Sequence, residues 1–179
     1  GHKMRPAIAG RGWNDDFHRY APHETAIVCS TEGELYRSMR DTLWFTVTSI
    51  TILLNKNMVD ISALGNIALI ALGKCVGIKI LKLEGRITQL HQITDISALG
   101  NCAGLEILDL SCCKNIVNIS ALGNCVGLKI LDLRFCDNIV NITAFENCVG
   151  LELLDLGFCK QITDITALGK CVCLKELDL

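Results

Sequence analysis

The feature that most constrains the fold is a repeat of fixed length. Three consecutive copies are equally long: LEILDLSCCKNIVNISALGNCVG (105–127), LKILDLRFCDNIVNITAFENCVG (128–150) and LELLDLGFCKQITDITALGKCVC (151–173). Two longer copies precede them, over 47–77 and 78–104. One such copy cannot bury its own apolar side chains, whereas a stack of copies can, so the chain should form a solenoid.

Within each copy, apolar residues stand at the first, fourth and sixth positions, and Cys or Asn usually stands at the ninth. Alternation around Leu105, Leu108 and Leu110 predicts a short parallel strand with one face turned inward. Stacking in register should place Leu108, Leu131 and Leu154 directly over one another.

Each full copy then has Ser or Thr before Ala-Leu or Ala-Phe. Such hydroxyls are good caps for a one-turn helix, and a glycine ends that turn in most copies. The residues concerned are Ser62, Ser97, Ser120, Thr143 and Thr166. With so short a period, the convex side should consist of 3₁₀ turns rather than long helices.

The order of these residues resembles the leucine-rich repeat, L-x-x-L-x-L-x-x-N/C, over about three-quarters of the chain. The cysteine at the ninth position is similar to the cysteine-containing subclass, and the D/N-I-S/T-A-L segment is similar to internalins. The LDLxxCxxIxxIxxL cadence is also similar to trypanosomatid leucine-rich-repeat proteins. The resemblance implies an α/β horseshoe with a concave parallel sheet, convex 3₁₀ or short helical turns, and a protein-binding role.

The chain divides into a capping region over residues 1–46 and repeats over residues 47–179. Copies of the repeat start at residues 47, 78, 105, 128, 151 and 174. Thr31 and Glu34 fit a capping box, which predicts a helix near residues 31–45 that covers the open end of the solenoid. The first three residues look like the remnant of a tag. The chain ends inside a predicted strand, so we expect its C-terminal end to be truncated.

Composition excludes several classes of function. The net charge of −2 gives no basic excess, so we expect no nucleic acid partner. The longest uncharged runs, 42–55 and 61–73, are shorter than the roughly 20 residues that a membrane span needs, so no membrane insertion is expected. We find no glycine-rich phosphate loop and no Ser–His–Asp set, and therefore expect no catalysis and no cofactor.

The 11 cysteines do not form a disulfide framework, because most of them recur at two positions of the repeat. Buried cysteine acts as a small hydrophobe, so reduced thiols in an intracellular, cytoplasmic protein are the expectation. A cell-surface location is the alternative. Without a C-x-x-C pair and with scattered histidines, no metal site is expected.

Four rows of outward-facing residues should run down the stack. Lys79, Glu106, Lys129, Glu152 and Lys175 alternate in sign, which favours in-register stacking. Next to them stand the aliphatic side chains of Ile107, Ile130 and Leu153. This second row either marks an interaction patch or reflects strand propensity and copying of the repeat.

The third row contains Asp109, Asp132 and Asp155, whose carboxylates ~5 Å apart repel each other by about 0.8 kcal/mol per pair in water. The row either has a structural role in the repeat or binds a basic partner; a cation is a further alternative. The fourth row is the most varied and places Phe135 and Phe158 at one rim, with Arg134 beside them.

Aromatic residues and arginine are enriched among binding hot spots, so Arg134, Phe135 and Phe158 are the leading candidates for partner contacts. The alternative is that both phenylalanines fill the interior of their own turns. The sequence thus predicts a non-catalytic module that binds another protein or peptide, with a basic one as an option, on its concave face. A cell-surface recognition protein and the substrate-binding part of a larger enzyme are the alternatives.

Overall fold

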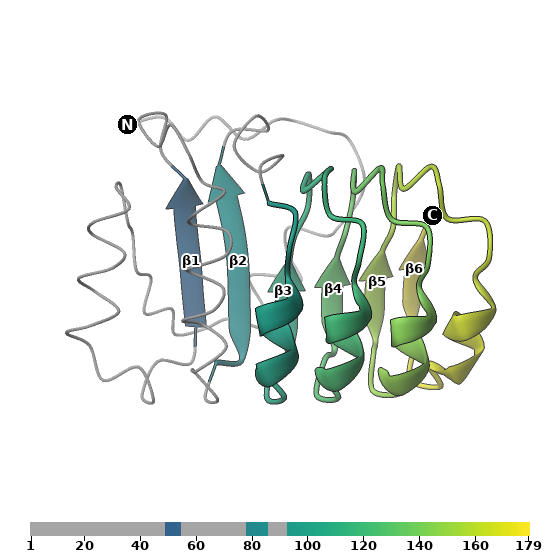
Figure 1. The fold of residues 1–179 in the computed structure, drawn as a ribbon. Coiled ribbons are helices and arrows are strands. Elements are labelled where there is room, and N and C mark those ends of the chain that lie inside the picture. Colours follow the sequence, from purple (N-terminus) through teal and green to yellow (C-terminus); the bar gives the residue numbers. More distant parts are fainter. Residues whose placement is uncertain (1–48, 55–77, 86–92) are drawn as a thin grey trace.

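The computed structural model describes residues 49–54, 78–85 and 93–179. Within these ranges, six strands form one parallel sheet in chain order, and Figure 1 shows each strand lying beside the last. They are β1 (Ser49–Leu54), β2 (Ile80–Gly85), β3 (Ile107–Asp109), β4 (Ile130–Asp132), β5 (Leu153–Asp155) and β6 (Glu176–Asp178). The predicted solenoid with a parallel sheet is confirmed.

The register of the sheet follows the alignment of the copies. Ser49 pairs with Ile80, Ile80 pairs with Ile107, and Ile107 pairs with Ile130, so copies of unequal length stack without a slip. Leu108 pairs with Leu131, and Leu131 pairs with Leu154, as predicted. Each repeat position therefore forms a row across the sheet.

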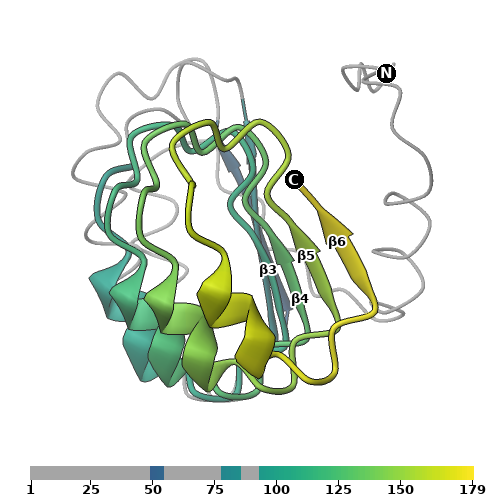
Figure 2. The same ribbon diagram turned by 90° about the vertical axis from the view of Figure 1, so that its right-hand side faces the viewer.

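In the described residues, four short 3₁₀ helices lie on the side of the solenoid away from the sheet, and Figure 2 shows them stacked there. They are η2 (Ser97–Asn101), η3 (Ser120–Asn124), η4 (Thr143–Asn147) and η5 (Thr166–Lys170). The expected convex 3₁₀ turns are confirmed. In the part of the chain that the structure describes, no helix is long and apolar enough to cross a membrane.

The capping contact of these helices differs from the prediction. The first Ser or Thr donates its backbone N–H to an Asp or Asn two residues earlier, as from Ser120 to Asn118 Oδ1 at 2.9 Å. The same bond recurs from Ser97, Thr143 and Thr166 to Asp95, Asn141 and Asp164. A carboxylate or amide oxygen at this spacing closes an Asx turn, so the acceptor is not the predicted hydroxyl. Hydrogen bonds from the backbone and hydroxyl of Thr166 lower the pKa of Asp164.

The core lies between the sheet and the 3₁₀ helices. The inward leucines Leu105, Leu108 and Leu110 are fully buried, as predicted. Seven of the nine described cysteines are also buried, and all nine are free thiols. The predicted helix near residues 31–45 and the rest of the capping region lie outside the described residues.

Buried cysteines tie each coil to the preceding one. Cys136 Sγ donates to the carbonyl oxygen of Leu110 at 3.3 Å, and that oxygen also accepts the N–H of Cys113 at 3.1 Å. Cys125 Sγ makes the corresponding bond to Leu99 in the other cysteine row, also at 3.3 Å. Burial raises the pKa of the Cys125 thiol to about 12, so the group stays protonated and able to donate.

Candidate interaction surface

The concave side of the sheet carries the predicted aliphatic row. Ile107, Ile130 and Leu153 pack together with Ile80 as an apolar cluster separate from the main core. Their side chains are only 4%, 3% and 7% exposed, respectively. The structure therefore brings these candidate residues together but leaves little of their surface accessible.

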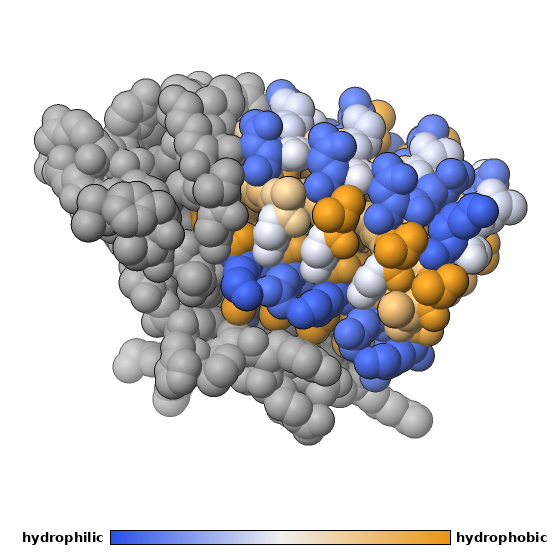
Figure 3. Space-filling model, turned by 90° about the horizontal axis from the view of Figure 1, so that it is seen from below, coloured by the Kyte–Doolittle hydropathy of each residue, from blue (hydrophilic) through white to orange (hydrophobic). Residues whose placement is uncertain are grey.

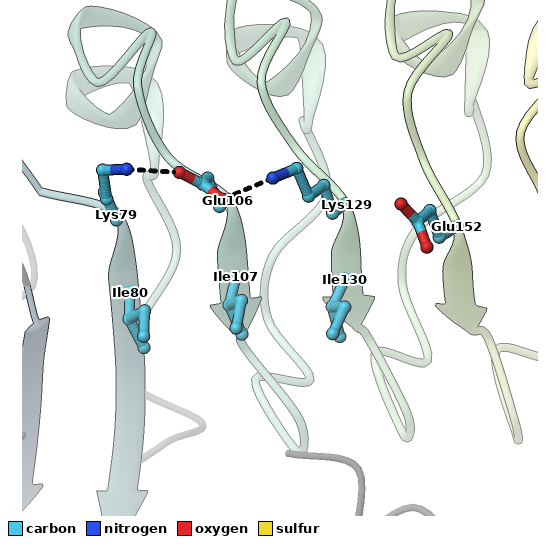
Figure 4. A pocket seen from close by; sticks show the side chains of 7 residues that line it. All are labelled: Lys79, Ile80, Glu106, Ile107, Lys129, Ile130 and Glu152. Atoms are coloured by element: carbon cyan, nitrogen blue, oxygen red, sulfur yellow. Dashed lines mark hydrogen bonds and ion pairs between the residues drawn. The ribbon is translucent and has the colours of Figure 1, made fainter. Parts of the chain in front are cut away.

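A cavity of about 380 Å³ lies over this row at the amino ends of the strands. Its floor is formed by Ile80, Ile107 and Ile130, and its rim by charged side chains (Figure 4). The rim consists of Lys79, Glu106, Lys129 and Glu152. An apolar floor with a charged rim is suited to an apolar side chain that carries polar groups on either side.

The charged rim is the alternating row predicted from the repeats. Glu106 accepts hydrogen bonds from the Nζ atoms of Lys79 at 2.8 Å and Lys129 at 2.6 Å, and Lys175 binds Glu152 at 2.6 Å. The hydrogen bond from Lys129 lowers the pKa of Glu106 most, and the hydrogen bond from Lys79 lowers it further. The in-register pairing is confirmed, and each exposed pair is worth about 0–1 kcal/mol.

The aspartate row closes the turns that follow the strands. The Oδ1 atoms of Asp109, Asp132 and Asp155 each accept a backbone N–H two residues later, at 2.9, 3.0 and 2.8 Å. Asp132 is 0% and Asp155 1% exposed, so both have a structural contact and almost no free surface. This geometry accounts for aspartate at this position of the repeat.

Arg134 joins two of these carboxylates. Its Nη2 lies 2.5 Å from Asp132 Oδ2, and its Nε lies 3.2 Å from Asp155 Oδ2. Burial raises the pKa of Asp155 to about 6. Burial, together with the charge of Asp132, raises the pKa of Asp109 to about 6 as well. The guanidinium therefore compensates a cluster of carboxylates that burial disfavours.

Phe135 and Phe158 form the aromatic rim. Their rings are stacked, with centroids 4.5 Å apart and an angle of 7° between the planes. Phe158 is 57% exposed, so this ring does not fill the interior of its turn, which was the alternative interpretation. The predicted neighbours are confirmed, and Arg134 comes directly before Phe135 in the same turn.

The backbone at this rim adopts a conformation that the sequence did not reveal. Phe135 and Phe158 have φ of 61° and 64°, and Cys112 at the same repeat position has φ of 65°. This left-handed region favours glycine and costs other residues about 1–2 kcal/mol. The only signal in the sequence is Gly85, the residue at this position in the copy that starts at residue 78.

The arrangement brings together the nine candidate residues on β3, β4, β5 and the turns after them. The sequence did not reveal the cavity. It predicted the row of lysines and glutamates that forms the rim, but only as a row that stabilises the stacking of the coils. Among the residues that the structure places, no group of three or more His, Cys, Asp or Glu side chains is arranged to hold a metal ion.

Comparison with solved structures agrees with this architecture. Internalin C2 of Listeria monocytogenes superimposes with a TM-score of 0.59 at 18% sequence identity, over 84% of this chain and 56% of that one. The chain has the leucine-rich-repeat fold. A second internalin of the same species matches with a TM-score of 0.43 at 19% identity, over 75% of this chain and 48% of that one.

The leucine-rich-repeat chain thus spans about half the length of the internalins it matches. No protein-family model and no curated protein matches its sequence. The likeness to trypanosomatid repeat proteins stays a prediction.

Proposed function

We propose that the chain is a non-catalytic module that binds another protein through the concave side and the aromatic rim of its repeats. The observation that carries this proposal is the stacked pair of Phe135 and Phe158. Two aromatic residues occupy a backbone conformation that favours glycine, and the ring of Phe158 is still 57% exposed. Cys112 has the same φ, so the left-handed turn belongs to the repeat, and what distinguishes this rim is the pair of stacked aromatic rings that stands on it.

The partner contact extends in this proposal from the aromatic pair to the cavity over Ile107 and Ile130. Exposed aromatic rings supply large contact area, and the cavity receives an apolar side chain of the partner. Asp132 and Asp155 are almost fully buried and paired with Arg134, so only the half-buried Asp109 of this row is proposed to face a basic side chain of the partner. Salt should weaken that one contact, because salt screens the attraction between the two charges.

The proposal is tested with Phe135→Ala and Phe158→Ala, singly and together. Proteins retained from lysate by the wild type and not by the double variant are identified, purified and measured directly by calorimetry. Val117→Ala is the matched control, since Val117 is 58% exposed and lies outside the rim. A loss of affinity of about 30-fold or more is expected for the double variant.

Unchanged affinity of a purified partner for the double variant would refute the aromatic rim as the contact surface. Circular dichroism of each variant establishes that the fold is kept. Phe158 is a better probe than Ile130 or Asp132, because those two side chains are 3% and 0% exposed and their replacement changes the fold itself.

The compartment is a separate part of the proposal. The free thiols of Cys136 and Cys159 each bind a backbone carbonyl of the preceding coil, which favours a protein that works in a reducing, intracellular environment. Counting thiols in the denatured protein tests this: 11 reactive thiols are expected, and a smaller number indicates the cell-surface alternative.

A further inference from the structure

A row of exposed valines lies at the amino-end edge of the solenoid, away from the aromatic rim at the carboxyl ends of the strands. Val126, Val149 and Val172 are 58%, 52% and 81% exposed. They occupy the same repeat position, two residues after the last residue of η3, η4 and η5. Figure 3 views the molecule from below and shows hydrophobic residues in a row across the coils beside a row of hydrophilic ones. Contiguous exposed apolar residues mark interaction sites.

The alternating charged row belongs to the same edge, three residues after the valines. In chain order it contains Lys79, Glu106, Lys129, Glu152 and Lys175. The ion pairs within the row leave the lysines accessible: the side chains of Lys79, Lys129 and Lys175 remain 58%, 50% and 69% exposed. Each ammonium group can therefore bind a second carboxylate on its solvent side.

When charges of alternating sign are evenly spaced in a row, a reversed second copy of the row can place an opposite charge in front of each one. A two-fold axis that lies in the plane of the edge, perpendicular to the rows, and passes between Lys129 and Glu152 produces this arrangement. Lys129 then faces Glu152 of the partner subunit, and Glu106 faces Lys175 of the partner subunit. The same operation lays the valine row on itself, with Val126 facing Val149 of the partner subunit.

We propose that this edge binds a second copy of the chain, antiparallel and two-fold symmetric. A two-fold interface uses the same patch on both subunits, so the patch must be self-complementary, as this one is in both charge and apolar character. A different protein would have to reproduce the sign alternation at the ~4.8 Å spacing of the coils. A second copy carries that spacing in its own sheet.

The contact is small. Four coils at ~4.8 Å give a patch well below the ~800 Å² per partner of a standard stable interface. The dimer is therefore weak and reversible, and it forms at high protein concentration. It leaves Phe135 and Phe158 free, because they stand at the opposite ends of the strands, but it uses the charged rim of the cavity and therefore competes with a partner side chain bound there.

Charge reversal provides the decisive experiment, with molar mass measured by sedimentation equilibrium over a concentration series of the full chain. Lys129→Glu places like charges opposite Glu152 of the partner subunit, and Glu152→Lys does the same opposite Lys129 of the partner subunit. Each variant alone should stay monomeric at concentrations where the wild type dimerises. An equimolar mixture of the two should dimerise again, since both contacts between unlike variants are attractive.

The valine row is tested with Val149→Asp, for which Val140→Asp is the matched control at 53% exposure outside the row. Only Val149→Asp should abolish dimerisation, with circular dichroism unchanged in both variants. A wild type that stays monomeric at the highest soluble concentration overturns the proposal. So do single charge variants that dimerise like the wild type, or a mixture that stays monomeric.

Discussion

Replacement of Arg134 by alanine tests whether the charged cluster beneath the aromatic rim holds the turns in place. The guanidinium contacts Asp132 at 2.5 Å and Asp155 at 3.2 Å, and these carboxylates are 0% and 1% exposed. Removing it leaves two buried carboxylates without this cation. The expected result is a large loss of stability from one partly exposed side chain.

The magnitude follows from the burial of the acids. Breaking a buried ion pair by removing one partner costs about 3–5 kcal/mol. Arg134 is itself 34% exposed, so solvent screening places the expected loss at the lower end, about 3 kcal/mol. This is a substantial part of the ~5–15 kcal/mol by which domains are usually stable.

The free energy of unfolding that is lost in Arg134→Ala should decrease at lower pH. The pKa of Asp155 is already raised to about 6, and Arg134 opposes that increase, so Arg134→Ala raises this pKa further. A raised pKa means that the folded state binds more protons than the unfolded state above about pH 4. Stability is therefore lost as the pH rises through the folded pKa, and the cost of Arg134→Ala shrinks below about pH 6.

Urea unfolding followed by circular dichroism at about pH 7.5 and about pH 5.5 measures both effects. Lys114→Ala is the control, because Lys114 and Asp137 form an ion pair at 3.3 Å whose side chains are 41% and 26% exposed, so it is far less buried than the Arg134 cluster and is worth about 1 kcal/mol. The reasoning is refuted if Arg134→Ala costs no more than Lys114→Ala at the higher pH, or if it costs as much at the lower pH.

Three further predictions concern single residues. Asp155→Asn should flatten the fall in unfolding free energy between about pH 4 and pH 6.5, measured by urea titration, because it removes a carboxyl group with a pKa raised to about 6. Cys173 is exposed and Cys136 fully buried, so a thiol reagent should label Cys173 about ten-fold faster or more in the folded protein, as followed by peptide mass spectrometry. Phe158→Gly should be more stable than Phe158→Ala by about 1 kcal/mol in thermal unfolding, because only glycine relieves the strain of a φ of 64°.

The repeat made the arrangement of rows predictable. Once the copies are aligned, every position fixes a row across the sheet, and the register from Ser49 to Ile80 to Ile107 follows the alignment. The inward leucines, the alternating ion pairs and the proximity of Phe135 to Phe158 all result from that one fact. Periodic patterns reveal which side chains share a face.

The burial of these side chains and the backbone torsion angles could not be predicted in the same way. The pattern placed Asp132 and Ile130 on the concave face. It did not predict that they are only 0% and 3% exposed, because burial depends on how neighbouring side chains fold over them. Nor did it reveal the φ of 61° at Phe135, which the closing turn imposes on whatever residue occupies that position. Phenylalanine has no intrinsic preference for that region, so composition gave no sign of it.

The turns with positive φ and the buried aspartates stabilise one another. Phe135 donates its N–H to the carbonyl oxygen of Gly157 at 2.9 Å, and Cys112 donates to that of Arg134 at 2.7 Å, so consecutive turns hold one another. The carboxylate of Asp132 fixes the same turn through the backbone N–H of Arg134. A left-handed residue anchored on both sides keeps its ring in place, so in the proposed binding mode less entropy would be lost when a partner binds. This preorganisation is the reason to test the aromatic rim first.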